Sequence, residues 1–161
     1  MRRGSAAQSR EERHGGVTTS KHLQHGLDVR TRGKGLYPFT DAVAQWLAHS
    51  EITVGLLTIF LQHTSASLLI QENYDPDVTA DLADYFERIA PERDPKYRHT
   101  LEGPDDMPAH IRTALTQTHL SIPIRNSRMT LGTWQGLYVF EHRKDPQVRH
   151  MVLHAAGESG S

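Results

Sequence analysis

The stretch ITVGLLTIFLQ, residues 52–62, decides the fold, because it is the part of the chain richest in consecutive apolar and β-branched side chains. A run of this length and composition predicts a buried β-strand. The run SLLIQ at residues 67–71 follows after a short polar segment and predicts its partner strand. Neither run approaches the roughly 18 apolar residues that a membrane-spanning helix needs, so we expect no membrane association.

Towards the N-terminus, residues 18–30 predict a further strand, and Gly33 and Gly35 mark a turn or bulge after it. Thr40 is the predicted N-cap of a short helix that runs to about His49, since apolar residues recur there with helical spacing.

Towards the C-terminus, Asp75 and Pro76 predict the start of an amphipathic helix, because Asp caps and Pro fits the first turn. Its apolar stripe is formed by Val78, Leu82, Phe86 and Ile89. A polar loop, 91–106, leads to a second helix that we expect Asp106 to cap, with Ile111 and Leu115 buried. Three strands complete the pattern, at residues 119–124, 137–142 and 148–155. Helices and strands cluster instead of alternating, which favours an α+β fold.

Length and composition suit one small domain. We expect residues 1–17 to form a flexible polar tail, residues 18–158 a single domain, and residues 159–161 a short C-terminal tail. The chain has no Cys, which excludes disulfides, thiolate metal sites and thiol catalysis. The net charge of −1 argues against a nucleic-acid partner. No apolar segment follows Arg2 and Arg3 as in a secretory signal, so we expect a cytoplasmic protein.

Although the net charge is close to zero, the acidic residues are concentrated in one block of the sequence. Residues 62–106 carry four basic and eleven acidic side chains, while the segments on either side each have a net charge of +3. His63, His99 and His110 border this block. Imidazole and carboxylate are what a divalent cation requires when thiolate is absent, so we predict a metal on these three histidines, with zinc as the favoured ion and magnesium as an alternative during turnover. The competing interpretation is a capped loop with ordinary surface histidines.

Three other groups of residues suit a binding or catalytic site. Thr64, Ser65 and Ser67 follow a strand and have hydroxyls suited to phosphate oxygens. Glu72, Asp105 and Asp106 are predicted to orient ligands or to act as acid and base, since the core needs none of them. Asn73 is a predicted substrate-binding residue, and the predicted contacts with the organic part of the substrate are Thr133, Trp134 and Gln135. Each group also has an ordinary structural explanation: a hydroxyl-rich turn, a helix cap, or a β-bulge with a core Trp.

Several long strings resemble the YjbQ-like family, also called the secondary thiamine-phosphate synthase enzyme family. They are LQHTSASLLIQEN at 61–73, DPDV at 75–78, YRHTLEGPDDMPAHI at 97–111, IPI at 122–124 and LGTWQGLYVFEHR at 131–143, followed by the pair Gly157 and Glu158. The resemblance implies a small α+β domain with a curved mixed sheet, assembled as a homotrimer. It also implies an activity that joins a pyrimidine diphosphate to a thiazole phosphate, as a secondary function.

Two functions remain open at this point. One is a metal-dependent enzyme that acts on small phosphorylated heterocycles. The alternative is a protein that binds a metal or a phosphorylated metabolite without dedicated catalysis.

Overall fold

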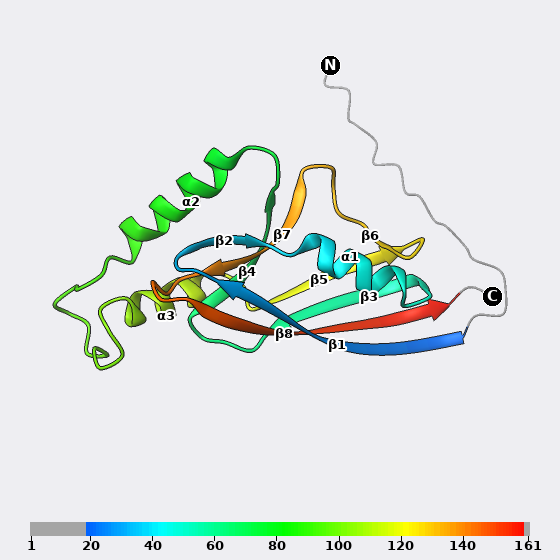
Figure 1. The fold of residues 1–161 in the computed structure, drawn as a ribbon, viewed down its shortest axis with the longest axis horizontal. Helices are drawn as coiled ribbons and strands as arrows, with labels where there is room; N and C mark the ends of the chain where they lie inside the picture. Colours follow the sequence, from blue (N-terminus) through cyan, green and yellow to red (C-terminus); the bar gives the residue numbers. More distant parts are fainter. Residues whose placement is uncertain (1–18, 160–161) are drawn as a thin grey trace, which may run out of the picture.

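The computed structural model describes residues 19–159 and confirms the α+β class, with two antiparallel sheets and three helices (Figure 1). The larger sheet has the strand order β1 (Thr19–Thr31), β8 (Gln147–Ser159), β3 (Ile52–Leu61), β5 (His119–Arg125) and β6 (Arg128–Met129). The smaller sheet has the order β2 (Gly35–Pro38), β7 (Gln135–Glu141) and β4 (Ala66–Glu72). The helices are α1 (Thr40–Ala48), α2 (Pro76–Ile89) and α3 (Asp106–Leu115).

All strand pairings between residues 19 and 159 are antiparallel, so the mixed sheet implied by the resemblance is wrong in this detail. An isolated antiparallel bridge links Leu68 of β4 to Gln117, two residues before β5, and the two sheets together form a curled half-barrel. The predicted tail at residues 1–17 and most of the tail at 159–161 lie outside the described residues, so their extent stays a prediction. Within residues 19–159, no helix has the length and hydrophobicity needed to cross a bilayer.

The core lies between the inner face of the larger sheet, the smaller sheet and α1. β5 shows why these residues form a strand with one buried face: Leu120, Ile122 and Ile124 are buried, and the residues between them are exposed. This strict alternation places every second side chain on the same face of the sheet. The two-residue turn between β5 and β6, Asn126 and Ser127, has positive φ at both positions, as tight hairpins require.

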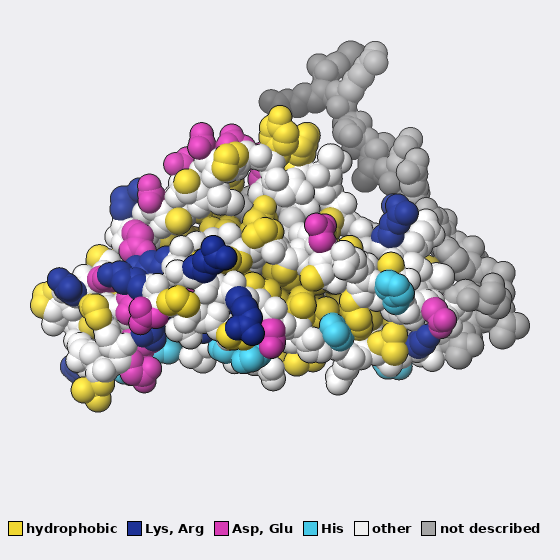
Figure 2. Space-filling view, in the orientation of Figure 1, with side chains coloured by type: hydrophobic (Ala, Val, Ile, Leu, Met, Phe, Trp, Pro, Cys, Tyr) yellow, Lys and Arg dark blue, Asp and Glu magenta, His cyan; other side chains and the backbone are white. Residues whose placement is uncertain are grey.

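Helix α2 begins as predicted, because the Asp75 carboxylate accepts a hydrogen bond from the Asp77 backbone N–H at 2.9 Å. Its predicted apolar stripe, however, is only half-buried, and no residue of the helix is fully buried. Figure 2 shows acidic side chains along the outer side of this helix and apolar ones between it and the sheets. The Phe86 ring nevertheless packs edge-on against Phe140 of β7, with the centroids 5.2 Å apart.

Two predicted helix caps are wrong. Phe39 precedes α1, and the Thr40 hydroxyl instead accepts a hydrogen bond from the Leu137 backbone N–H at 2.8 Å. Asp105, not Asp106, occupies the N-cap position of α3, and it makes no side-chain capping bond. The predicted burial of Leu115 is also wrong, because its side chain is 61% exposed. Sequence analysis also missed the short strands β2 and β6.

Candidate metal centre

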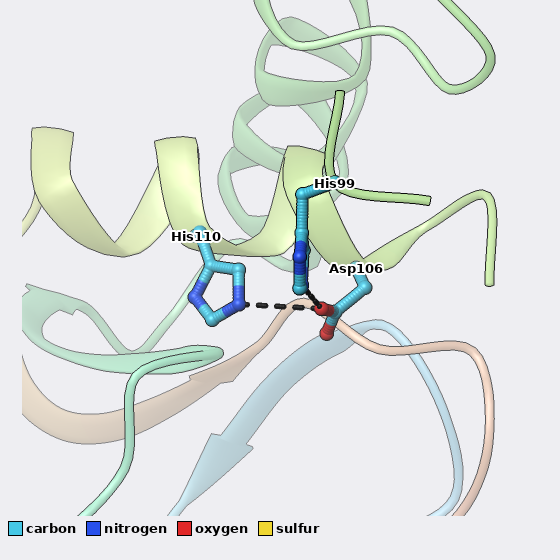
Figure 3. Close-up of side chains that lie close together, drawn as sticks. All are labelled: His99, Asp106 and His110. Atoms are coloured by element: carbon cyan, nitrogen blue, oxygen red, sulfur yellow. Dashed lines mark hydrogen bonds and ion pairs between the residues drawn. The ribbon is translucent and has the colours of Figure 1, made fainter. Parts of the chain in front are cut away.

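Two histidines and one carboxylate converge at the start of α3 (Figure 3). Asp106 and His110 lie four residues apart and therefore on the same face of the helix. His99 reaches the same point from the loop that precedes the helix. One potential ligand atom from each of His99, Asp106 and His110 lies within 4.8 Å of the other two.

The distances fit a tetrahedral ion after a small movement. His110 Nε2 lies 3.3 Å from Asp106 Oδ2, and His99 Nε2 lies 2.6 Å from the same oxygen. Zinc–ligand bonds of ~2.0–2.1 Å in a tetrahedron separate two ligand atoms by about 3.3 Å. The first pair already has this separation. The second pair is a hydrogen bond, and His99 would move away by about 1 Å or less to reach the tetrahedral separation; its side chain is 42% exposed.

The hydrogen bonds of His110 leave its Nε2 lone pair facing the carboxylate. Its Nδ1 donates a hydrogen bond to the Thr64 backbone carbonyl at 2.9 Å. A neutral imidazole carries one proton, so Nε2 then has a lone pair directed at Asp106. Such an arrangement is repulsive unless a proton or a cation lies between the two groups. Histidines that bind metals commonly donate their second nitrogen to a carbonyl in this way.

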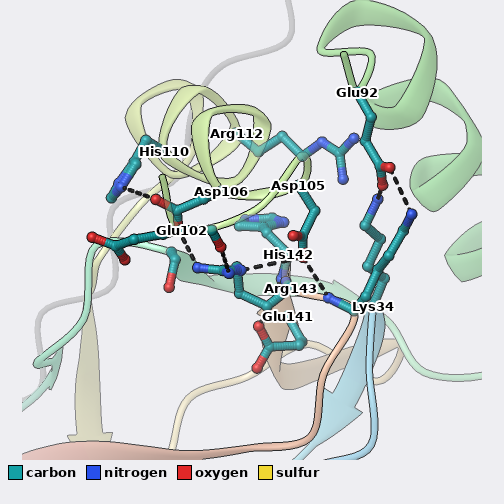
Figure 4. Close-up of polar contacts among 12 residues, drawn as sticks. Lys34, Glu92, Glu102, Asp105, Asp106, His110, Arg112, Glu141, His142 and Arg143 are labelled. Atoms are coloured by element: carbon teal, nitrogen blue, oxygen red, sulfur yellow. Dashed lines mark hydrogen bonds and ion pairs between the residues drawn. The ribbon is translucent and has the colours of Figure 1, made fainter. Parts of the chain in front are cut away.

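Arg143 forms ion pairs with both Asp105 and Asp106 (Figure 4). Its guanidinium pairs with Asp106 Oδ1 through Nη1 and with Asp105 Oδ2 through Nε at 3.2 Å. Its remaining nitrogen donates to the Glu102 backbone carbonyl at 2.8 Å. One Asp106 oxygen is thereby fixed by Arg143, which leaves the other oxygen directed at the two histidines. Sequence analysis missed Arg143, since a single loop arginine gives no local signal.

Asp105 has a structural role in the same loop. It is 6% exposed, and its carboxylate also accepts a hydrogen bond from the Lys144 backbone N–H at 2.9 Å. Burial raises the pKa of Asp105, but the Lys144 N–H and the Arg143 charge outweigh it and hold the pKa below its usual range. Asp105 therefore stays ionised at neutral pH and positions Arg143.

His63 is not part of the cluster. Its Nε2 accepts a hydrogen bond from the His150 backbone N–H at 2.8 Å, and its Nδ1 lies 3.3 Å from Arg149. Burial, followed by the nearby charges of Arg149 and His150, lowers the pKa of His63 below its ordinary value. Both ring nitrogens of His63 thus face N–H donors, one from His150 and one from Arg149, and neither is directed at the cluster. The third potential ligand of the cluster is Asp106, whereas the sequence analysis predicted His63.

A cavity of about 800 Å³ adjoins the cluster through His110. Its walls come from the end of β3, the segment 62–65, α3 and the segment between α3 and β5, and no Asp or Glu lines it. The polar side chains that line it are Gln62, His63, Thr64, Ser65, His110, Thr113, Thr116 and Thr118. The cavity thus combines hydroxyls with one edge of the candidate metal centre.

Ser67 does not face this cavity. It is fully buried, and its hydroxyl lies 2.9 Å from Nε2 of His142, which is also fully buried. Next to this pair, Glu141 forms a buried ion pair with Arg149 and accepts a hydrogen bond from Thr31. Sequence analysis did not recognise this buried polar group. The signal was the placement of charged residues within otherwise apolar strands.

The other predicted site residues lie at the opposite end of the smaller sheet. Glu72 pairs with Gln135 in the β4–β7 register, six residues from the Ala66–Glu141 pair that lies near the cluster. At about 3.4 Å per residue, the separation along the strand is about 20 Å. Asn73, Thr133 and Trp134 belong to this distant end. Trp134 is not a core residue: it is 57% exposed and packs edge-on against Tyr74.

The family model and the most similar relatives agree on one family. Residues 25–158 match the family model described as UPF0047 protein YjbQ-like. The UPF0047 protein sll1880 of Synechocystis sp. is 50% identical over 142 residues, covering 88% of this chain and 97% of the relative. The YjbQ protein of Escherichia coli O157:H7 is 38% identical over 136 residues, covering 84% and 98%.

Solved structures share the fold. A YbjQ-like protein of unknown function from Sulfolobus solfataricus superimposes with a TM-score of 0.79 at 22% identity, covering 86% of this chain and 99% of that protein. A conserved hypothetical protein from Thermus thermophilus has a TM-score of 0.72 at 33% identity, covering 80% and 97%.

Proposed function

The chain belongs to the UPF0047 family of YjbQ-like proteins, and we propose that it is a metal-dependent enzyme that acts on small phosphorylated heterocycles. The observation that carries the proposal is the convergence of His99, Asp106 and His110, with the second nitrogen of His110 held by a backbone carbonyl. Two imidazoles and one carboxylate form a typical donor set for a catalytic divalent ion, which keeps one position open.

Zinc fits this donor set better than magnesium. Imidazole nitrogen is a common zinc ligand, whereas magnesium prefers oxygen ligands in octahedral geometry. When bound, a zinc ion would supply positive charge for phosphate oxygens at the edge of the cavity. Arg143 and Asp105 would hold the Asp106 carboxylate in place.

The cavity suits a small anionic ligand. Thr113 and Thr116 donate their hydroxyl protons to the helix carbonyls of Ala109 and Arg112, which leaves their oxygens as acceptors only. Thr64 and Ser65 lie in the segment that connects β3 and β4, where they line the cavity, and their hydroxyl groups can donate hydrogen bonds to phosphate oxygens. The absence of carboxylates from the wall avoids repulsion of such a ligand.

The reaction we propose follows the family resemblance. The bond between the pyrimidine methylene carbon and its diphosphate breaks, and pyrophosphate leaves with the electron pair. The thiazole ring nitrogen then forms the new C–N bond with its lone pair. The chain's own residues would bind the diphosphate of one substrate and the phosphate of the other, hold the rings together and exclude water from the cationic carbon.

A ligand-binding protein without catalysis is the second candidate, and one observation favours it. Of the predicted acid/base residues, Asp105 is fully engaged by Arg143 and Lys144, and Glu72 lies about 20 Å along the strand from the cluster. Within one chain, therefore, neither of them reaches the cavity. The homotrimer implied by the resemblance, which could bring Glu72 and Trp134 of another copy to the cavity, is part of our proposal.

Metal analysis tests the proposal directly. Protein purified without added metal is expected to contain one zinc per chain, and His99→Ala and His110→Ala to lose it. His49→Ala, on an exposed residue that is remote in sequence from the cluster, is the matched control and is expected to keep it. Pyrophosphate release from the two substrates that stops on chelation would favour the enzyme. Tight substrate binding without release would favour the binding protein. Metal-free protein in which all three variants behave alike would refute the metal site and the metal-dependent enzyme that rests on it.

A further inference from the structure

The hairpin between β5 and β6 places two arginines opposite each other at the edge of the larger sheet. Arg125 ends β5, Arg128 begins β6, and the strand register pairs them directly. Residues paired in this way project from the same face of a sheet, where like charges destabilise the hairpin. An anion bound between the two guanidinium groups replaces this repulsion by attraction. The arrangement therefore favours a negatively charged ligand at the hairpin.

Two cavities meet at this pair of strands. The first, of about 490 Å³, is lined by Arg125, Asn126, Arg128, Met129, Thr130 and Leu131. The second, of about 570 Å³, shares four of these residues with the first and continues to α1 and Gln135. Both volumes are in the range of small-molecule sites, about 300–1,000 Å³. No Asp or Glu lines either cavity, so their walls do not repel an anion.

Two polar side chains of this site have no partner in the part of the chain that the structure describes. Among residues 19–159, neither the guanidinium of Arg128 nor the side-chain amide of Asn126 forms a hydrogen bond or an ion pair. Both side chains are exposed, and both line the two cavities. The positive φ values of Asn126 and Ser127 fix the tight turn between the two arginines. The hairpin thus presents hydrogen-bond donors in a fixed position.

The second cavity adds apolar walls to the site. Ala44 and Ala48 lie four residues apart on α1 and therefore on the same side of that helix. Met129 and Leu131 also line this cavity, and both pack partly against the core. Because an alanine side chain ends at Cβ, α1 leaves room there for an apolar group of the size of one ring. The site therefore combines a cationic part with an apolar part.

We propose that this site binds a small phosphate monoester with an aromatic or other apolar body. A phosphate monoester carries a charge of about −1.5 to −2 at neutral pH, which matches two guanidinium groups better than a single carboxylate does. Guanidinium groups also donate pairs of parallel hydrogen bonds to phosphate oxygens. The phosphate lies between Arg125 and Arg128, and the body of the ligand lies in the second cavity against Ala44 and Ala48.

This site is separate from the candidate metal centre. Thr118, immediately before β5, lines the cavity beside His110, whereas Arg125 is the last residue of β5. At about 3.4 Å per residue, the seven residues of β5 put its two ends about 20 Å apart. Figure 1 also shows α3 and β6 towards opposite ends of the molecule. The proposal therefore goes beyond the proposed function and does not rest on it.

Phenyl phosphate is the probe, because it joins a phosphate monoester to a single ring. NMR titration of the full chain in excess chelator measures its Kd, and the backbone amides report where it binds. We expect a Kd of about 1 mM or tighter, with shifts at Ala48 and Arg128. Inorganic phosphate lacks the ring, and benzoate carries only one negative charge. Each is expected to bind at least about tenfold more weakly than phenyl phosphate.

Two arginine substitutions locate the phosphate. Arg128→Gln is expected to weaken phenyl phosphate binding at least about tenfold, because it removes a charged donor. Arg30→Gln is the matched control, since Arg30 is an exposed arginine of β1, at the opposite edge of the same sheet. The control is expected to bind phenyl phosphate as the wild type does.

A substitution on α1 locates the apolar body. Ala48 is exposed, so Ala48→Phe fills the second cavity without entering the core. This variant is expected to weaken the binding of phenyl phosphate at least about tenfold and to leave that of inorganic phosphate unchanged. Ala44→Leu replaces it if circular dichroism shows that Ala48→Phe does not fold.

Four results would overturn the proposal. One is the absence of phenyl phosphate binding at ten times the expected Kd. Another is equal weakening by Arg128→Gln and Arg30→Gln, which would reflect only the net charge of the chain. The third is a set of shifts confined to Thr64, Ser65 and His110, which would place the ligand in the cavity beside the metal centre. The fourth is benzoate or inorganic phosphate binding as tightly as phenyl phosphate. All of these measurements use metal-free protein, so failure of the proposed function leaves them unaffected.

Discussion

Replacement of Asp106 by Asn tests whether this carboxylate is a metal ligand, because the neighbouring Asp105 provides a matched control with a structural role. Both carboxylates are buried, at 1% and 6% exposure, and both accept from Arg143. Only Asp106 contacts His99 and His110. Asn has nearly the same shape as Asp but lacks the negative charge.

The expected magnitudes follow from these contacts. In metal-free protein, each variant weakens charged hydrogen bonds to Arg143, which keeps its other partners, so each is expected to lose about 1–3 kcal/mol of unfolding free energy. For zinc, loss of a second-shell group typically costs about 10–100-fold in affinity. Loss of a direct ligand is expected to cost at least the upper end of that range, or about 2.8 kcal/mol.

The assay is competition with a chromophoric zinc chelator at about pH 7, with urea unfolding in excess chelator as the stability measurement. Asp106→Asn is expected to weaken zinc binding at least about tenfold more than Asp105→Asn does. Equal zinc affinities for the two variants, at similar losses of stability, would refute Asp106 as a ligand. A larger loss for Asp105→Asn would refute the assignment of the two roles.

Three further predictions concern stability. Burial, followed by the charges of Arg112, Arg149 and Lys34, lowers the pKa of His142 to about 3. The unfolded chain therefore binds a proton below its ordinary pKa near 6.5 while the folded chain does not, so stability falls as the pH falls from about 6.5 towards 3, by about 2 kcal/mol at pH 5. His142→Gln is expected to remove this part of the pH dependence, and an unchanged slope in urea titrations would contradict it. Gly55→Ala is expected to destabilise by about 2–3 kcal/mol, because its Cβ would lie 2.2 Å from the Ala156 carbonyl oxygen. The control is Gly132→Ala, whose Cβ would have no neighbour closer than 3.5 Å, and this variant is expected to melt like the wild type. Equal melting temperatures for the two variants would exclude the close approach of Gly55 to the Ala156 carbonyl. A chain that starts at Thr18 is expected to melt within a few degrees of the full chain; a large drop in calorimetry would mean that the preceding residues pack on the domain.

Local patterns in the sequence predicted most of the elements that carry the site. The apolar run at 52–62 forms β3, the alternation at 119–124 forms β5, and Asp75 caps α2 as its position before Pro76 indicates. These features depend on neighbours within a few residues, because the periodicity of burial and the capping bond are both local. The pairing of His99 with His110 was predicted for a similar reason, since one short loop joins them.

The sequence by itself therefore determined the α+β class, most element boundaries and two of the three residues in the candidate metal centre. Tertiary structure decided the rest. It selected Asp106 instead of His63 as the third donor, because the backbone of His150, 87 residues away, takes the free nitrogen of His63. It also separated Glu72 and Trp134 from the cluster by the length of β4 and placed Phe60 on an uncovered sheet face. Such contacts follow from sheet register and loop packing between distant segments, which local periodicity does not encode.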